Sequence, residues 1–399
     1  MPKISSKGLI MPESPIRKLT PYANDAKQKG IEVYHLNIGQ PDIQSPKVAM
    51  DAVKNHNINI LAYTSSNGSL EYRSKLADYY KTKNIEVTAE DIIVTTGGSE
   101  ALSFAISTVA DANDEIIIPE PFYANYNGFA VQNNVKVVPV EAKLENNFAL
   151  PAIDAFEALI TKHTKAILIC NPGNPTGYVY TKQEIIQLAE LVKKYNLFLI
   201  ADEVYREFIY SDAQHHSVLS IEGIEEHAIL IDSVSKRYSM CGARIGCVVS
   251  KNVQVIKTIL KFAQARLSPP TFAQIASEAA LETPKAYFEE VTTTYEERRN
   301  ILLNGLAAIP GVKVNRPQGA FYCIAELPVD NAEKFAQWLL EHFNLDDETV
   351  MVAPAAGFYS TIGKGLQQVR VAYVLEKEKL IRAVHILKEA ISTYQEQEK

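Results

Sequence analysis

The feature that most constrains this chain is an alternation of short β-branched apolar runs with helical patterns between residues 92 and 249. Such alternation is typical of parallel strands joined by crossover helices. Several runs are apolar at consecutive positions, as in strands that helices cover on both faces. We therefore predict an α/β fold whose strands span residues 92–96, 115–119, 135–140, 165–171, 197–202, 228–233 and 245–250.

The pattern changes after about residue 281, which predicts a second, α+β region. Before that point, Thr181 and Glu184 form a capping-box pattern that predicts a helix over residues 181–195. The second region is expected to contain a polar helix around Arg298, two later amphipathic helices, and short strands at 312–314, 321–324 and 368–374.

Composition excludes several classes of protein. The chain has 399 residues and a net charge of −7, which does not favour a nucleic-acid partner. Its longest apolar runs are far shorter than the ~20 residues that cross a bilayer, and residues 1–19 show no signal-peptide pattern. Four cysteines without a CxxC pair fit a reducing compartment. We expect a cytoplasmic protein that binds neither nucleic acid nor membranes.

Ligands of open α/β sheets bind outside the carboxyl ends of the strands, so the residues after each predicted strand are candidates for a site. Gly97, Gly98, Ser99 and Glu100 follow the first strand and begin a helix. Glycines let the backbone approach a ligand, and the free N–H groups of a helix start bind anions. Because neither the Walker A nor the GxGxxG spacing is present, a monophosphate fits better than a nucleotide. A plain tight turn is the equal alternative.

Two further strand ends carry polar groups. The loop 171–177 is so rich in Asn, Pro and Gly that its shape is nearly fixed, which serves either a structural turn or the placement of Asn174 over a ligand. Asp202 ends an apolar strand, where an unpaired charge is costly, so we expect a cationic partner. That partner is either a protein side chain or the protonated ring nitrogen of a ligand.

Lys236, shortly after the strand 228–233, is the best candidate for a nucleophile. A lysine in this place can form a Schiff base with a carbonyl, and Ser233 and Arg244 would suit a phosphate. The alternative is an ordinary exposed lysine. Arg370 shares its strand face with small and apolar residues, so it needs a carboxylate, from the protein or from a substrate.

Taken together, these residues resemble those of the class I/II aminotransferases, the pyridoxal-phosphate (PLP) enzymes of fold type I, and in particular the bacterial aspartate and aromatic aminotransferase branch. The resemblance covers almost the whole chain and rests on the order and spacing of Arg370 and of segments 36–42, 63–68, 97–102, 121–123, 171–177, 202–205 and 233–246.

The resemblance implies an α/β fold with a mainly parallel seven-stranded sheet flanked by helices and a smaller α+β domain. The implied boundaries are an N-terminal arm over 1–30, a small domain of 31–48 plus 300–399, and a large PLP-binding domain of 49–299. The arm would lie on a surface or be disordered.

The resemblance also implies a role for each site residue. Lys236 would hold PLP as a Schiff base and later move a proton between the substrate Cα and C4′ of the cofactor. Asp202 would pair with the pyridine nitrogen, and Arg370, with Gly39 and Asn174 nearby, would bind the substrate α-carboxylate. The other cofactor contacts would be to the phosphate, from Gly98, Ser99, Glu100, Ser233, Arg244 and Tyr63 of a neighbouring subunit, and to the ring, from Tyr123, Asn174 and Tyr205.

The implied activity is ping-pong amino transfer between an amino acid, with aspartate first, and 2-oxoglutarate, in a homodimer with active sites at its interface. Tyr123 replaces a tryptophan of the best-known aspartate enzymes, Ala243 replaces an aromatic residue, and no arginine maps onto their distal-carboxylate site. An aromatic or alanine-type aminotransferase and a PLP-dependent C–S β-lyase are therefore alternatives. Arg266 would either face a dicarboxylate or be a surface charge.

Overall fold

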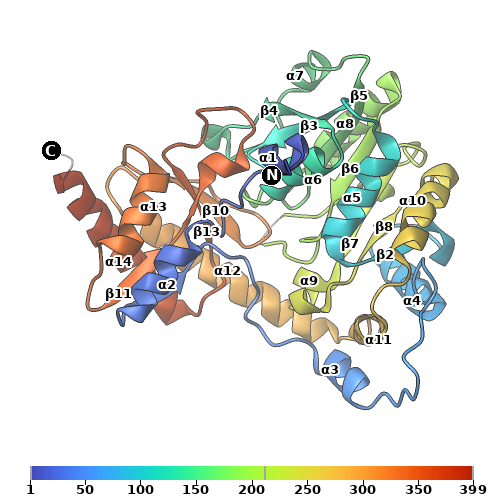
Figure 1. Ribbon diagram of the computed structural model, residues 1–399, viewed down its shortest axis with the longest axis horizontal. Helices are drawn as coiled ribbons and strands as arrows, with labels where there is room; N and C mark the ends of the chain where they lie inside the picture. The colour runs from blue at the N-terminus through green and yellow to red at the C-terminus, as the bar shows by residue number, and fades with distance from the viewer. Residues whose placement is uncertain (1, 211–212, 398–399) are drawn as a thin grey trace.

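The computed structural model describes residues 2–210 and 213–397. Met1 and residues 211–212 and 398–399, which fall in the predicted arm, large domain and small domain, lie outside the described residues. Figure 1 shows a large sheet with its helices beside a smaller α+β region that contains the C-terminus, while the N-terminal helix lies over the large region.

The large region is built on a seven-stranded sheet in the order β2-β8-β7-β6-β5-β3-β4. Within the described chain, β8 alone runs antiparallel to its neighbours in this sheet. The prediction of a mainly parallel sheet is confirmed, and every predicted strand boundary lies within one residue of the observed one. The strands are β2 (Ile92–Thr95), β3 (Glu115–Glu120), β4 (Lys136–Glu141), β5 (Thr164–Cys170), β6 (Phe198–Asp202), β7 (Ala228–Ser233) and β8 (Gly246–Val249).

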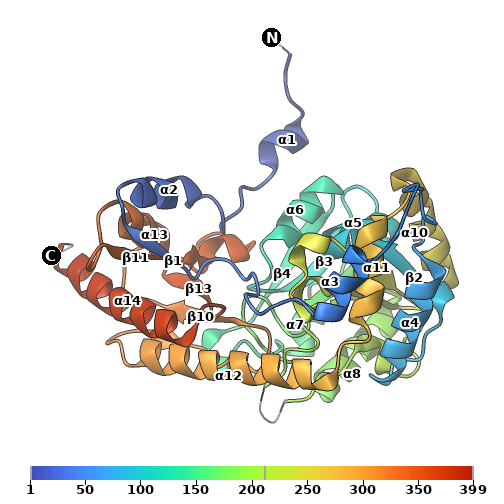
Figure 2. The ribbon, with the colours of Figure 1, turned by 90° about the horizontal axis from the view of Figure 1, so that it is seen from below.

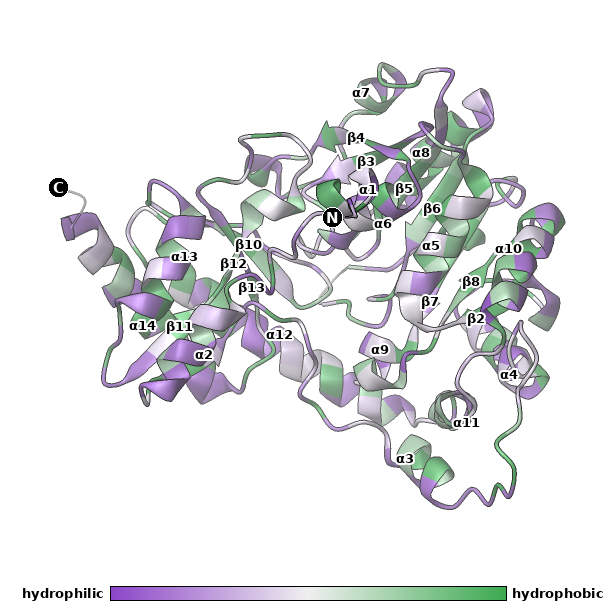
Figure 3. Ribbon diagram, viewed as in Figure 1, coloured by the Kyte–Doolittle hydropathy of each residue, from purple (hydrophilic) through white to green (hydrophobic). Residues whose placement is uncertain are grey.

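Both faces of this sheet are buried, which explains the consecutive apolar residues. In β5, Ala166 and Leu168 join one core cluster, whereas Ile167 and Ile169 join a second cluster on the opposite face. Figure 3 shows the strands as hydrophobic bands between helices. The helices of this region are α3 (Lys47–Lys54), α4 (Leu70–Lys81), α5 (Gly97–Val109), α6 (Asn125–Gln132), α7 (Ile153–Glu157), α8 (Lys182–Tyr195), α9 (Val234–Arg237), α10 (Val253–Arg266) and α11 (Thr271–Ala280).

Helix α8 begins as its sequence predicts. The Thr181 hydroxyl accepts a hydrogen bond from the backbone N–H of Glu184 at 3.2 Å, and the Glu184 carboxylate accepts one from the backbone N–H of Thr181 at 2.7 Å. Ile185, Leu188 and Val192 are buried on one face of the helix. The capping box and the 3.6-residue period together fix both the start and the orientation of this crossover.

The smaller region joins the two ends of the chain. Strand β1 (Glu32–His35) pairs in parallel with β11 (Glu348–Met351). An antiparallel sheet beside this pair has the order β12-β13-β10-β9. Its strands and the packed helices are β9 (Lys313–Val314), β10 (Tyr322–Glu326), β12 (Ala353–Pro354), β13 (Gln368–Ala372), α2 (Thr20–Gln28), α13 (Ala332–Glu341) and α14 (Lys377–Gln397).

Helix α12 (Lys285–Ala307) runs along one side of the molecule and joins the two regions, as Figure 2 shows. It is the polar helix predicted around Arg298. That side chain is buried and forms an ion pair with Asp42 at 2.6 Å. Of the helices described here, α12 and α14 included, none is long and apolar enough to cross a membrane.

The N-terminal arm has two parts. Helix α1 (Ser6–Ile10) buries none of its residues and projects from the body in Figure 2. Helix α2 buries Ala23 and Ala26. Between the two helices, the backbone oxygen of Ile16 accepts a hydrogen bond from the Asn37 amide at 2.8 Å, which ties the arm to the loop after β1.

Candidate active site

A cleft of about 350 Å³ lies at the carboxyl ends of the large sheet, against the smaller region. The loops after β2, β3, β5, β6 and β7 reach it from the sheet, while β13 and the loop after β1 reach it from the smaller region. The predicted site residues that line it are Gly39, Gly98, Ser99, Tyr123, Asn174, Asp202, Tyr205, Ser233, Lys236, Arg244 and Arg370.

Asp202, at the end of β6, is a buried carboxylate that forms no ion pair with any described side chain. The Tyr126 hydroxyl donates to its Oδ2 at 2.8 Å, and the Val204 N–H lies 3.4 Å from Oδ1. Burial raises the pKa of Asp202 to about 6, although the Tyr126 hydrogen bond opposes the rise. The expected protein ion pair occurs instead at the next residue, where Glu203 pairs with Arg206 at 3.0 Å.

Arg370, on β13, is a buried guanidinium with 1% of its surface exposed. It donates to Asn174 Oδ1 at 3.1 Å and to the Asn37 backbone oxygen at 2.5 Å, and it lies 4.3 Å from the Tyr322 ring centroid and 4.9 Å from that of Phe358. No described carboxylate pairs with it, and its buried Nε has no hydrogen-bond partner. Burial accordingly lowers its pKa. The sequence predicts either a protein carboxylate or a substrate carboxylate as the partner of Arg370. Among the described residues no protein carboxylate takes this place, so the substrate carboxylate is the partner that remains.

Lys236 lies in α9 and is half-buried, so it is not the ordinary exposed lysine of the alternative interpretation. Its Nζ donates to the Gly39 backbone oxygen at 2.8 Å. The same Nζ lies 3.8 Å from Cys241 Sγ. A Cβ on Gly39 would lie 1.8 Å from the Tyr322 hydroxyl oxygen, which explains why the sequence has glycine there. The amine therefore reaches the cleft between the sheet and the loop after β1.

The start of α5 and the loop before β8 form an anion-binding corner. Gly97 has φ +78°, and a Cβ there would lie 2.4 Å from Arg244 Nη2. The guanidinium therefore lies against the free N–H groups of the helix start. Ser233 Oγ lies 2.7 Å from Ser235 Oγ and donates to the Ile245 backbone oxygen at 2.8 Å. A helix N-terminus beside an arginine is suited to a phosphate.

Three residues of the sequence analysis lie away from the cleft lining. The Glu100 side chain turns back to accept the Thr96 N–H at 2.7 Å and lies 3.5 Å from Arg266 Nε. Arg266 is thus neither a surface charge nor a residue of the cleft, because 16% of its side chain is exposed and its partner is Glu100. Tyr63 is 80% exposed, and its predicted role in a neighbouring subunit stays a prediction.

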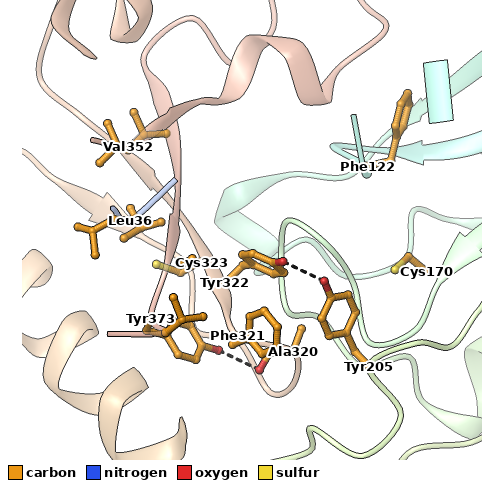
Figure 4. Close-up of a cluster of buried hydrophobic side chains, with 14 of the residues drawn as sticks. Leu36, Phe122, Cys170, Tyr205, Ala320, Phe321, Tyr322, Cys323, Val352 and Tyr373 are labelled. Atoms are coloured by element: carbon orange, nitrogen blue, oxygen red, sulfur yellow. Dashed lines mark hydrogen bonds between the residues drawn. The ribbon is translucent and has the colours of Figure 1, made fainter. Parts of the chain in front are cut away.

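Sequence analysis missed Tyr322 and Tyr126, which shape the site beside the predicted Tyr205. Tyr322 and Tyr205 meet edge to face with their hydroxyl oxygens 2.9 Å apart (Figure 4). The register of β10 against β13 brings Tyr322 beside Arg370, and such a register is invisible in one sequence. Tyr126 had no local signal, because Asp202, the carboxylate to which it donates, lies 76 residues later in the chain.

Taken together, the cleft contains a carboxylate and a guanidinium that lack protein partners of opposite charge, an amine, and an anion-binding corner. These groups suit a ligand pair that provides a cationic ring nitrogen, a carbonyl carbon, a phosphate and a separate carboxylate.

Comparison with known proteins bears on this chemistry. The family model for aminotransferase class I and II matches residues 31–387. The aspartate aminotransferase of Pyrococcus horikoshii is 34% identical over 395 residues, which are 97% of this chain and 97% of that protein. The chain belongs to the class I and II aminotransferases. Enzymes of this family are generally PLP-dependent.

Solved structures of relatives share the whole fold. A Thermus thermophilus aspartate aminotransferase solved with maleate matches with a TM-score of 0.89 at 29% identity, over 98% of this chain and 100% of that one. An alanine aminotransferase from Pyrococcus furiosus matches equally, at 30% identity. An aromatic-amino-acid aminotransferase of Thermococcus litoralis is 30% identical over 380 residues, 93% of this chain and 94% of that protein. The chain is therefore an aminotransferase of fold type I, from a family whose members differ in substrate.

Proposed function

We propose that this aminotransferase uses PLP to exchange an amino group between aspartate and 2-oxoglutarate by a ping-pong mechanism. The observation that carries the proposal is the presence of Asp202 and Arg370, buried in one cleft, each without an oppositely charged partner among the described side chains. A buried charge that lacks its partner lowers the stability of the folded protein by about 3–5 kcal/mol. A protonated ring nitrogen and a substrate carboxylate would supply both partners.

The residues present fit PLP. Its protonated ring, when bound, accepts the electrons released as the substrate Cα loses its proton. Lys236 would hold the aldehyde carbon and Asp202 the ring nitrogen, where a cation would lower the raised pKa of the carboxyl. The remaining contacts would be to the phosphate, from the backbone of Gly98, Ser99 and Glu100 with Ser233 and Arg244, and to the ring, from Tyr123, Tyr205 and Asn174.

The chain's own residues would then perform the proton transfer. Arg370 binds the α-carboxylate through its planar fork and thereby orients the Cα–H bond toward Lys236. Once the substrate amino group has displaced it from the aldehyde carbon, the free Lys236 amine would take the proton from Cα and return it at C4′. The buried rings of Tyr322 and Phe358 cover Arg370 and exclude water from the carboxylate. The same steps in reverse, on 2-oxoglutarate, complete the cycle.

A half-reaction tests this function. Holoenzyme mixed with aspartate, without a 2-oxoacid, should form about one oxaloacetate per active site and convert the cofactor absorbance to that of the amine form. Adding 2-oxoglutarate should restore the first spectrum and yield glutamate. Lys236→Ala is the matched control and should do neither. Failure of the wild-type protein to convert with any amino acid, or repeated turnover without a 2-oxoacid as a lyase would show, would contradict the proposal.

The same screen decides between aspartate and the alternatives. Alanine and aromatic aminotransferases occur among the similar proteins, so alanine and phenylalanine are the competing donors. Faster conversion by either would replace aspartate in the proposal and leave the transaminase mechanism in place.

We further propose a homodimer. An exposed apolar set lies on two neighbouring segments, where Thr271 Oγ1 donates to the Ala62 oxygen at 3.4 Å. Its members are Ile60, Leu61, Tyr63, Leu267 and Phe272. A surface of this kind is typical of a protein interface, and covering it would bring Tyr63 of one subunit toward its partner. Sedimentation should give about twice the mass of one 44.3 kDa chain, and a monomer would refute the dimer.

We also propose the domain division predicted above, with an arm (1–30), a small domain (31–48 and 300–399) and a large domain (49–299). The parallel pairing of Glu32–His35 with Glu348–Met351 supports joining the two small-domain segments. The cytoplasm is proposed as the location, because the four cysteines are free.

A further inference from the structure

One cation of the cleft has no role in the proposed reaction. Four basic side chains line the cleft: Arg17, Lys236, Arg244 and Arg370. The cofactor aldehyde, its phosphate and the substrate α-carboxylate account for the last three. The described lining contains a single carboxylate, Asp202, which the ring nitrogen accounts for. Arg17 is therefore a surplus positive charge in a site for amino acids.

The arm holds Arg17 in place at the mouth of the cleft. The residue before it, Ile16, accepts the 2.8 Å hydrogen bond from Asn37, whose backbone oxygen in turn binds Arg370. Pro15 packs so closely on Gly357 that a Cβ there would lie 2.5 Å from the proline Cβ. The backbone at Arg17 is thus fixed relative to the α-carboxylate site, although the Arg17 side chain itself is exposed.

Arg17 has no protein partner among the described residues, in contrast to its neighbour. Lys18 forms an ion pair with Glu333 at 2.6 Å, whereas no ion pair or hydrogen bond joins the Arg17 side chain to a described residue. Its charge is close enough to Tyr123 to favour ionisation of that phenol, and Arg370 acts on it in the same direction, although burial raises the pKa of Tyr123 to about 12. Both guanidinium groups therefore lie within electrostatic reach of one lining residue.

We propose that Arg17 binds the side-chain carboxylate of a dicarboxylic substrate whose α-carboxylate is bound by Arg370. A guanidinium offers a carboxylate two parallel hydrogen bonds, and an unpaired one at a cleft mouth selects anionic side chains over neutral ones. Arg17 is then a specificity-determining residue for four- and five-carbon dicarboxylates. The inference rests on the proposed function.

Binding of substrate-sized acids without turnover tests Arg17 directly. Succinate and butyrate have the same four-carbon chain, with two carboxylates and one. The Arg17→Met substitution should raise the dissociation constant of succinate from the holoenzyme at least about tenfold and leave that of butyrate within about twofold, as measured by calorimetric titration. Lys18→Met, which changes the adjacent arm cation, should leave both constants unchanged. Three results would overturn the role of Arg17: an equal loss of affinity for both acids in Arg17→Met, no loss of affinity for succinate in that variant, or no preference for succinate over butyrate in the wild-type protein.

Kinetics separate this inference from the proposed function. Arg17→Met should lower kcat/KM for aspartate at least about tenfold and leave kcat/KM for alanine within about twofold. If the wild-type protein transfers amino groups and this variant keeps the preference for aspartate, the role of Arg17 is refuted and the transaminase remains. If succinate binding depends on Arg17 and no amino acid reacts, the transaminase is refuted and the dicarboxylate site remains.

Discussion

Replacing Asp202 by asparagine is expected to stabilise the cofactor-free protein at neutral and alkaline pH. Burial raises the pKa of this carboxyl from its usual 3.8 to about 6, so the folded protein binds its proton more tightly than the unfolded chain does. The stabilising contribution of the protonated form is complete below about pH 4 and is lost as the pH rises through about 6. Asparagine stays neutral and still accepts the hydrogen bond from Tyr126.

The size of the effect follows from the shift. A rise from 3.8 to about 6, at about 1.4 kcal/mol per unit, corresponds to about 3 kcal/mol. The free energy of unfolding of the Asp202→Asn variant should therefore exceed that of the wild-type protein by about 3 kcal/mol near pH 8 and by about half of that near pH 5.

Urea unfolding of both apoproteins across this pH range measures the difference. Asp25→Asn, which changes an exposed aspartate on α2, is the control and should change little. In saturating PLP the wild-type protein should be the more stable of the two, because only the Asp202 carboxylate pairs with a ring cation. A variant that is less stable than wild type near pH 8, or a difference that does not change with pH, would refute the account of Asp202.

Three further substitutions test the cleft and its support. Arg370→Lys keeps the charge but loses the planar fork, so kcat/KM for the amino acid should fall about 100-fold; steady-state kinetics within about threefold of wild type would contradict the assignment. Asp232→Asn removes the buried carboxylate that pairs with Arg237 and with a second arginine, and urea unfolding should show a loss of about 3–5 kcal/mol. A loss below about 1 kcal/mol would show that the ion pairs contribute little. Gly39→Ala would place a carbon 1.8 Å from the Tyr322 hydroxyl oxygen, so overpacking should cost about 1–3 kcal/mol and lower the melting temperature. An unchanged melting temperature would show that this contact is not rigid.

The large sheet was predictable because its signal is local. Each strand is a short apolar run between turn residues, and the sheet is buried on both faces, so periodicity and length mark the strands without knowledge of the fold. The strand ends that carry Asp202 and Lys236 were found by the same logic, since the carboxyl ends of parallel strands meet at one edge.

Other parts of the site depend on pairings that one sequence does not reveal. Tyr322 reaches Arg370 through the register of two strands that are far apart in the chain, and Arg17 reaches the cleft because Asn37 ties down the arm. The surface-charge interpretation of Arg266 is wrong, because the side chain is mostly buried beside Glu100, which lies more than a hundred residues earlier in the chain; the dicarboxylate interpretation stays a prediction. Long-range contacts of this kind come from the packing of elements and not from their local sequence.

Chemical trapping of the cofactor tests the central claim most directly. Borohydride reduction of the PLP-loaded protein, followed by peptide mass analysis, locates any lysine that carries the cofactor. The account predicts a pyridoxyl group on the peptide that contains Lys236, at about one per chain, and none in Lys236→Ala. A label on another lysine, or equal labelling of the variant, would contradict it.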